Sequence, residues 1–212
     1  MPTSIYLDKR GHRLPSVTQV LGASWSKGDA LIAWANREGL EGRSHTAARD
    51  AAATVGTIAH ELALSGMGGA SPDLSGFSES AVKAARIPHL HALGWIDAHD
   101  VQGILVEQPL SSGKLGYGGT PDWYGLLDGV LTVLDIKTSK GIYPSHFVQC
   151  AAYAALLEDA GHQVERIAVL HLPRTISGHA RQHIQEGEKL SRTKEGWQAV
   201  LRLYQIQVII GF

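Results

Sequence analysis

Apolar positions along this chain recur with two different spacings, and the spacing changes near residue 100. Up to that point they recur every three to four residues within alanine-rich segments, which is typical of amphipathic helices. After a short strand at Ser4–Leu7, we therefore expect helices over residues 29–40, 44–64 and 81–99. A loop rich in glycine and serine, residues 66–80, separates the last two helices.

Beyond residue 100 the apolar runs become short, and glycine and aspartate bound them, which is typical of strands. Strands are expected to begin near Gly103, Gly119, Leu131 and Val164, and a more polar strand is expected near residues 178–185. Helices over residues 143–159 and 188–210 complete the pattern. This order of elements predicts an α/β fold, with a mixed central sheet and helices on both of its faces.

The length of 212 residues fits one domain, which we expect to cover residues 1–212. Within it we expect a mainly helical N-terminal part at residues 1–100, a sheet core at 101–175, and a C-terminal strand and helix at 176–212. With 44% hydrophobic and 18% charged residues, the chain has enough apolar side chains to build a core and is not expected to be disordered.

The segment 118–137, GGTPDWYGLLDGVLTVLDIK, places chemistry on a predicted hairpin. Asp128-Gly129 lies between two apolar runs, which is a strong signal for a tight hairpin turn. Strand side chains alternate between the two faces, so Asp135 and Lys137 share a face with the apolar residues Leu131 and Val133. Pairing of the two strands folds Asp122 back to the same end. Two carboxylates and a lysine are therefore expected to converge there.

This combination suits catalysis on a phosphate. Mg²⁺ prefers oxygen ligands and is commonly held by one or two carboxylates together with substrate phosphate oxygens. Such a cation activates water and neutralises charge on the phosphate, while a lysine can orient the water or stabilise the transition state. The alternative is a surface hairpin with solvated side chains, which an isolated D-x-K would favour. The preceding Thr120-Pro121-Asp122 and the spacing of about a dozen residues favour the site.

Pro121-Asp122 and Asp135-Ile136-Lys137 resemble the two signature halves of the PD-(D/E)XK nuclease superfamily. The closer resemblance is to its RecB-like exonuclease branch, which includes phage and mitochondrial genome-maintenance exonucleases. The resemblance implies a restriction-endonuclease-like fold and a Mg²⁺- or Mn²⁺-dependent exonuclease that hydrolyses phosphodiester bonds in DNA. The catalytic residues would be Asp122, Asp135 and Lys137.

Three further segments are similar to this branch. They are the Pro-Ser-Val-Thr of residues 15–18, the Gly-Thr-x-x-His that ends at His60, and the Gln149-x-x-x-Tyr153 pair. The resemblance implies that His60 faces the carboxylates, and that Gln149 and Tyr153 contact the substrate. An ordinary core or surface histidine and a buried polar ladder are the respective alternatives.

Ser16 and Thr18, in the first of these segments, have two possible roles. Either residue could contact a substrate phosphate, or it could cap the helix that follows, which is the more common role of such residues. For the metal, the resemblance implies ligation by Asp122, Asp135, the Ile136 carbonyl and His60. Glu107 is a candidate second acid, although an exposed strand face would explain it equally well.

Several other sites are excluded by the sequence. Cys150 is the only cysteine, so neither an internal disulfide nor the iron–sulfur cluster of some RecB-like nucleases can form. His60-Glu61 cannot begin the zinc-protease pattern H-E-x-x-H, because the final histidine is replaced by Leu64. No apolar run approaches the ~20 residues needed to span a bilayer, and the start lacks the apolar core of a signal peptide. We therefore expect a cytoplasmic protein without a membrane partner.

The partner expected from the resemblance is DNA, single- or double-stranded, in replication, recombination or repair, with a phage-derived origin as one possibility. The formal net charge of −1 means that DNA binding would depend on a local basic groove. Basic residues of the C-terminal part could flank the substrate or simply be solvated: Arg174, Arg181, Lys189, Arg192 and Lys194. A homo-oligomer or a recombination partner protein is also compatible with the resemblance.

Two alternative functions stay open at this point. One is a nuclease-fold DNA-binding or recombination accessory protein without catalytic activity, and the other is a restriction-type endonuclease. The presence of Asp122, Asp135, Lys137 and His60 disfavours the first. The histidine ahead of the hairpin and the Gln-x-x-x-Tyr pair disfavour the second.

Overall fold

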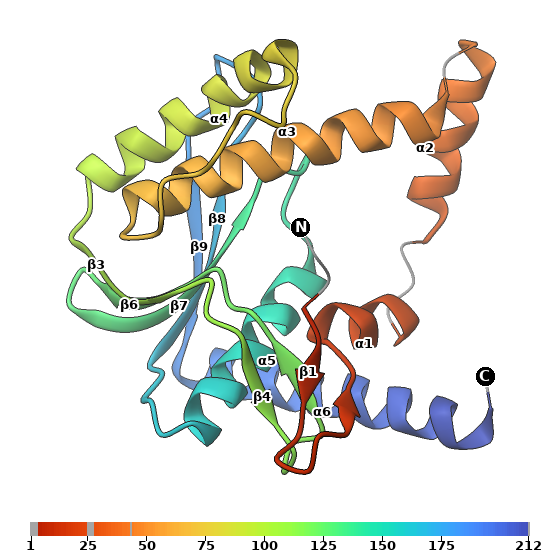
Figure 1. The fold of residues 1–212 in the computed structure, drawn as a ribbon, viewed down its shortest axis with the longest axis vertical. Helices are drawn as coiled ribbons and strands as arrows, with labels where there is room; N and C mark the ends of the chain where they lie inside the picture. The colour runs from red at the N-terminus through yellow and green to blue at the C-terminus, as the bar shows by residue number, and fades with distance from the viewer. Residues whose placement is uncertain (1–3, 25–27, 43, 212) are drawn as a thin grey trace.

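A mixed five-stranded sheet forms the centre of the computed structural model, which describes residues 4–24, 28–42 and 44–211. The strands lie in the order β3 (Val101–Val106), β6 (Trp123–Leu127), β7 (Val130–Lys137), β8 (Arg166–His171) and β9 (Arg181–Glu186). Only the β7–β8 pair is parallel, and helix α5 (Pro144–Asp159) connects these two strands (Figure 1). The expected α/β class with a mixed central sheet is confirmed.

The β6–β7 hairpin has the predicted turn. Asp128 and Gly129 both have positive φ, 52° and 78°, as a two-residue type I′ turn requires. The register pairs Trp123 with Leu134. Because the strands are antiparallel, the residue before Trp123 lies opposite the residue after Leu134, which places Asp122 opposite Asp135. Local sequence therefore brings the two carboxylates to one end of the sheet.

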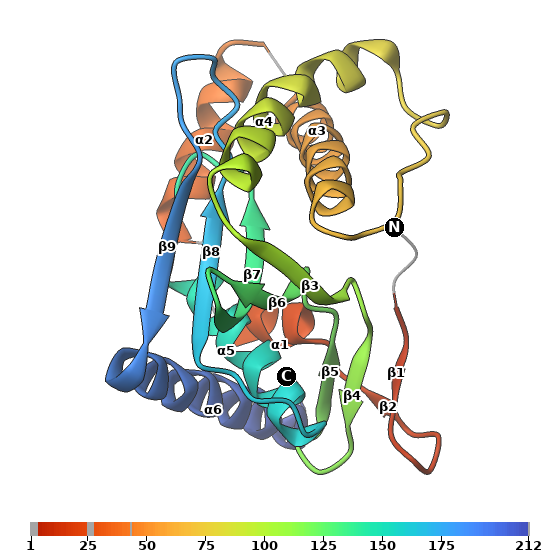
Figure 2. The same cartoon turned by 90° about the vertical axis from the view of Figure 1, so that its left-hand side faces the viewer.

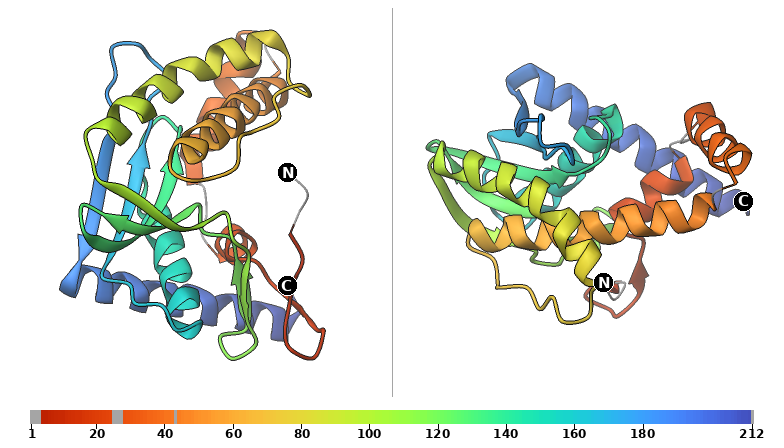
Figure 3. Two further views of the ribbon diagram at one scale, coloured as in Figure 1. Left: turned by 60° about the vertical axis from the view of Figure 1, so that its left-hand side comes forward. Right: turned by 90° about the horizontal axis from the view of Figure 1, so that it is seen from above.

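Helices cover both faces of the central sheet (Figures 2 and 3). On one face, α5 packs with α1 (Val17–Ser24) and α6 (Gly187–Ile210) over a core that includes Val133 and Val169. On the other face, α3 (His45–Gly66) and α4 (Glu79–Asp97) pack over Leu134 and Ile136. Neighbouring residues of β7 thus enter opposite cores, as the period-two alternation of a strand requires.

Peripheral elements surround this core. Helix α2 (Gly28–Leu40) precedes α3, and β1 (Tyr6–Leu7) pairs with β2 (Arg13–Leu14) in a small hairpin near the N-terminus. Helix α3 begins after Ser44, whose hydroxyl accepts a hydrogen bond from the backbone N–H of Ala47. No helix in the part of the chain that the structure describes is both long and apolar enough to cross a membrane.

The prediction for the strands around residues 103–127 was partly wrong. The expected strand at residues 103–110 divides into β3 and β4 (Leu110–Ser112), and β4 pairs with β5 (Tyr117–Gly119) in a separate two-stranded sheet. The central sheet takes Trp123–Leu127 rather than a strand that begins at Gly119. The physical reason lies in Glu107, which has positive φ, and in Pro109 and Pro121, which have no N–H to donate to a strand ladder. The polar β9 also joins the central sheet, at its edge.

Candidate active site

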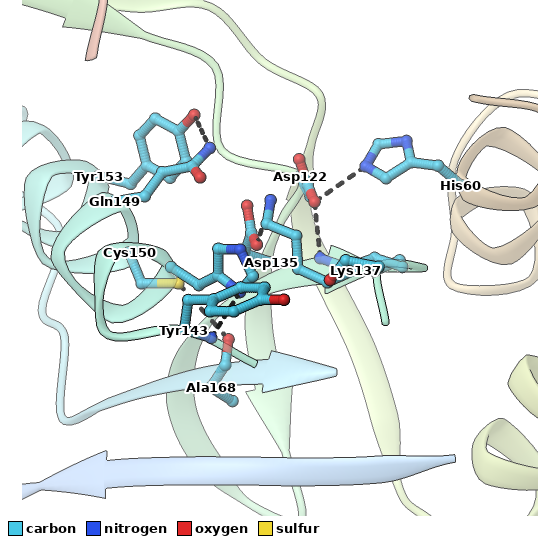
Figure 4. Close-up of polar contacts among 12 residues, drawn as sticks. His60, Asp122, Asp135, Lys137, Tyr143, Gln149, Cys150, Tyr153 and Ala168 are labelled. Atoms are coloured by element: carbon cyan, nitrogen blue, oxygen red, sulfur yellow. Dashed lines mark hydrogen bonds and ion pairs between the residues drawn. The ribbon is translucent and has the colours of Figure 1, made fainter. Parts of the chain in front are cut away.

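Asp122 lies at the point where the chain enters β6, and its Oδ2 atom accepts two hydrogen bonds (Figure 4). One comes from the backbone N–H of Ile136 at 2.7 Å, and the other from His60 Nε2 at 2.9 Å. Burial alone would raise the pKa of Asp122, but the charge and hydrogen bond of His60, with Lys137 and the Ile136 N–H, hold it below its usual value. Asp122 is therefore a carboxylate at neutral pH.

Asp135 is completely buried, and its environment is unusual for a carboxylate. Its Oδ2 atom lies 2.6 Å from Lys137 Nζ, while Oδ1 has no hydrogen-bond partner. Burial, assisted by the charge of Asp122 and opposed by Lys137, raises the pKa of Asp135 to about 6. A buried carboxylate oxygen without a partner is costly to fold, and perturbed acids of this kind concentrate at functional sites.

Lys137 follows Asp135 on the same face of β7, and its ammonium group pairs with the Asp135 carboxylate. Burial would lower the pKa of Lys137, but the charges of Asp135 and Asp122 outweigh that effect and raise it. In the metal-free protein the ammonium group is therefore protonated at neutral pH. It can donate hydrogen bonds and stabilise negative charge, but it does not act as a base in that state.

His60 approaches the carboxylates from α3, on the other side of the strand end (Figure 4). Burial would lower its pKa, but the charge and hydrogen bond of Asp122, with smaller effects of Glu107 and Asp135, raise it to about 9. Gly56, one turn earlier on α3, permits the close approach of the helix. A Cβ atom there would lie only 3.0 Å from Thr138 Oγ1. The predicted placement of His60 on a helix that faces the carboxylates is the placement in the structure.

Glu107 lies close to this group, although it is not part of a strand. Its backbone N–H donates to the Asp122 carbonyl at 3.0 Å, and its Oε1 atom lies 3.8 Å from His60 Nδ1. Burial, together with the charge of Asp122, raises the pKa of Glu107. Its φ of 48° is a backbone strain of about 1 kcal/mol for a residue with a side chain. With 41% of its side chain exposed, Glu107 faces solvent at the rim of the site.

Gln149 and Tyr153 lie one helical turn apart on α5, and the Gln149 amide Nε2 donates to the Tyr153 hydroxyl at 2.9 Å (Figure 4). The phenol is buried, with 4% exposure, and Gln149 is partly exposed. Gly119 makes this packing possible, because a Cβ atom there would lie 2.7 Å from Tyr153 Cε1. The arrangement orients Gln149, the one member of the pair that a substrate can reach.

Ser16 acts as a helix cap in the structure. Its hydroxyl accepts a hydrogen bond from the backbone N–H of Gln19 and lies 3.0 Å from Thr18 Oγ1. A bridge pairs Ser16 with Gly118, just ahead of the segment that leads to Asp122. Of the two roles considered for these residues, capping is therefore present for Ser16. A phosphate contact by Ser16 or Thr18 stays a prediction.

The residues present suit a hard divalent cation. Asp122 and Asp135 supply carboxylate oxygens, and the Asp135 Oδ1 atom lacks any other partner. The backbone N–H of Ile136 points to Asp122. In an extended residue the C=O points to the same neighbouring strand as the N–H. The Ile136 carbonyl is therefore also expected to face Asp122. Among the described residues, no three His, Cys, Asp or Glu side chains are already grouped around one metal position. Instead, His60 and Lys137 each pair with a carboxylate oxygen.

Three further residues lie near the site and are not among those that the sequence assigns to it. The Tyr6 hydroxyl lies 2.9 Å from Thr120 Oγ1, which ties β1 to the segment before Asp122. His146 accepts a hydrogen bond from the Tyr143 backbone at the start of α5, and burial, with the charges of Lys137 and His171, lowers its pKa to about 4. Arg174 is half-buried and donates to Thr138 Oγ1. Only the helical spacing of His146 from Gln149 could have indicated its position.

No protein-family model and no curated protein matches this chain. Among solved structures it is similar to one named "Putative exonuclease" from Eubacterium rectale, with 14% sequence identity and a TM-score of 0.36 over 87% of this chain and 71% of that one. It is also similar to the structure of SSO0001, with 14% identity and a TM-score of 0.28 over 59% of this chain. That match spans 61% of SSO0001, less than two thirds of its length. Likenesses at these TM-scores carry no weight, so function has to be inferred from the site itself.

Proposed function

We propose that the protein is a Mg²⁺- or Mn²⁺-dependent deoxyribonuclease of the PD-(D/E)XK superfamily, and that it acts as an exonuclease of the RecB-like branch. The observation that supports this most directly is the buried Asp135 beside Lys137 and opposite Asp122, with one carboxylate oxygen left without a partner. A buried carboxylate oxygen without a partner lowers the stability of the fold, whereas a cation site requires an oxygen that is free to bind the metal.

Each residue has a role in this proposal. Asp122, Asp135 and the Ile136 carbonyl would hold the metal together with His60, which has to give up the proton that its raised pKa retains at neutral pH. Glu107 at the rim would assist a second metal. When bound, the cation supplies Lewis-acid activation of water and neutralises charge on the phosphate. The protonated Lys137 orients the attacking water and stabilises the charge that develops on the phosphate. Gln149, oriented by Tyr153, positions the DNA strand through hydrogen bonds that carry no net charge.

Asp135→Asn and Lys137→Ala test the proposal. Each is expected to lower the rate of DNA hydrolysis by at least about 10²–10³-fold, because each removes a group that acts on the developing charge. The matched controls are Asp159→Asn and Lys114→Ala, which break an Asp–Lys ion pair with 3.1 Å separation at the C-terminal end of α5. The controls should keep wild-type activity, and circular dichroism should show that all four variants fold.

End-labelled linear DNA, single- and double-stranded, and a closed circle are the substrates, each with Mg²⁺, Mn²⁺ or EDTA. Digestion of linear DNA alone, abolished by EDTA and by Asp135→Asn, is the expected result, and the position of the label then gives the polarity. Cutting of the circle would replace the exonuclease with an endonuclease. Binding without cutting in either metal would contradict catalysis and leave a DNA-binding accessory protein. Full activity of folded Lys137→Ala would refute the role of the lysine.

A further inference from the structure

A second pocket lies beside the candidate active site, at the end of β7. It has a volume of about 510 Å³ and is lined by residues from α3, from the segment after β7 and from the segment after β8. The lining residues are Ala52, Thr138, Ser139, Lys140, His171, Pro173, Arg174 and Thr175. Thr138 follows Lys137 directly in the chain. On α3, Ala52 lies two turns before His60, roughly 12 Å along the helix axis.

The lining of this pocket has the composition of an anion site. It contains two cationic side chains, a histidine and three hydroxyl groups, and it contains no carboxylate. Among the described residues, neither Lys140 nor Arg174 forms an ion pair with an acid. Burial alone accounts for the lowered pKa of Arg174. None of the described acidic side chains therefore neutralises this positive charge.

The guanidinium group of Arg174 is fixed by one hydrogen bond, but not all of its N–H donors have an acceptor. Its Nη2 atom donates to Thr138 Oγ1 at 3.0 Å, while its Nε atom is buried without any partner. Gly56 leaves the space for this side chain, because a Cβ atom there would lie 3.3 Å from Arg174 Nη2. A buried guanidinium N–H without a partner costs free energy, so the position of Arg174 is not explained by stability, and its more exposed N–H groups can donate to a tetrahedral anion in the pocket.

The surrounding segments are ordered by their own hydrogen bonds. His171 Nε2 lies 2.7 Å from the Ser139 carbonyl, and the Ser139 hydroxyl donates to the Gly141 carbonyl. From α4, His91 Nε2 lies 3.0 Å from the Thr175 carbonyl. These bonds fix the walls of the pocket and leave the cationic groups of Arg174 and Lys140 available. Such preorganisation is what a binding site needs to avoid an entropic cost on binding.

We infer that this pocket binds a phosphate group of the nucleic-acid strand, a few nucleotides from the scissile bond, with Arg174 as the central ligand and Lys140 at the entrance. The inference rests on the proposed nuclease function and assigns a further substrate contact to it. The phosphate can be an internal one of the backbone or a terminal one, and both present the same oxygen acceptors to the guanidinium. Contacts of this kind set the position of a strand without reading its sequence.

Fluorescence anisotropy of labelled oligonucleotides, with EDTA present, tests the pocket without any need for cleavage. Arg174→Gln is expected to weaken binding about 5- to 10-fold, and Lys140→Gln about 2- to 5-fold, with a decrease of the salt-dependence slope by about one for each. The matched control is Lys114→Gln, which removes an exposed lysine that pairs with Asp159 and should bind as the wild type does. Lys140 is exposed, and its side chain forms no hydrogen bond in the part of the chain that the structure describes, so its variant tests the pocket even if Arg174→Gln unfolds.

Oligonucleotides with a 5′-phosphate, a 3′-phosphate or neither distinguish the two sources of the phosphate. An equal loss of affinity on all three indicates an internal phosphate, and a loss confined to one end indicates a terminal phosphate. In a cleavage assay, Arg174→Gln should raise KM with little change of kcat.

Wild-type affinity in folded Arg174→Gln and in Lys140→Gln would overturn the inference while leaving the nuclease intact. Arg174-dependent binding by a protein that cuts no DNA would keep the pocket and refute the nuclease.

Discussion

At the scale of single residues, the candidate site is defined by what its groups lack. Asp135 has an oxygen without a hydrogen bond, His60 has a buried Nδ1 atom without one, and Glu107 keeps a strained backbone conformation. Each of these features costs free energy in the folded state. Their concentration around one strand end supports the proposed site, because perturbed groups of this kind gather at functional sites.

His146 allows a pH prediction that does not involve the carboxylates. Its Nδ1 accepts a hydrogen bond from the Tyr143 backbone, and its pKa is lowered to about 4 by burial and by the charges of Lys137 and His171. Because the unfolded chain binds a proton near the ordinary value of about 6.5, the contribution of this residue is complete above that pH. It is lost as the pH falls towards 4.

Urea denaturation at pH 7.5 and pH 5 measures this effect. Between these values the wild type should lose about 1 kcal/mol more unfolding free energy than His146→Gln, after a discount for the partial exposure of the ring. An equal loss in the two proteins would show that His146 is not responsible.

At the scale of elements, close packing around the strand end depends on glycine. The Gly118-Gly119 pair lies where β5 passes Tyr6, Val17 and Tyr153, and a side chain at either position would overlap with these residues. Through Gly119, α1 and α5 both contact the segment that leads to Asp122. The position of Gln149 relative to the carboxylates is therefore coupled to the absence of one Cβ atom.

Gly119→Ala is expected to lower the unfolding free energy by about 1–3 kcal/mol, because the new methyl group would lie 2.7 Å from Tyr153 Cε1 and 2.9 Å from Val17 Cγ2. It should also reduce nuclease activity. Gly196→Ala is the matched control, since a Cβ at that position of α6 meets nothing within 4 Å. That change should stabilise the protein by about 0.5–1 kcal/mol. Thermal denaturation compares the two, and equal effects would contradict the packing explanation.

At the scale of the whole molecule, the site joins the two helical layers. His60 comes from the layer formed by α3 and α4, while Asp135 and Lys137 face the layer that contains α5. Asp122 contacts both His60 and the end of β7, at the junction of the layers. A cation bound between these groups would therefore link α3 to the central sheet.

Mg²⁺ or Mn²⁺ is expected to raise the Tm of the wild-type protein by about 5–10 °C at a concentration near 100 times Kd, relative to NaCl of equal ionic strength. The shift should disappear in Asp135→Asn and persist in Asp159→Asn, which changes an acid far from the strand end. Differential scanning fluorimetry is sufficient for the measurement. An undiminished shift in Asp135→Asn would show that the metal binds elsewhere.

Local sequence by itself determined the hairpin, the alternation of residues on β7 and the start of α5 at Pro144. These features depend on interactions between residues close in the chain: a turn that needs two positive φ values, a period of two, and a proline that fits the first helical turn. For the same reason the sequence predicts that Asp122, Asp135 and Lys137 meet at one end of the sheet.

Only the tertiary structure decided how the distant segments meet there. The position of Glu107 beside His60 and the burial of Arg174 against Thr138 depend on how α3 packs across the strand end. No periodicity encodes such contacts, because they join segments that are far apart in the chain. Their geometry depends on the volumes of the side chains packed between them. At Gly56, for example, the absence of a Cβ atom lets Thr138 and Arg174 approach α3.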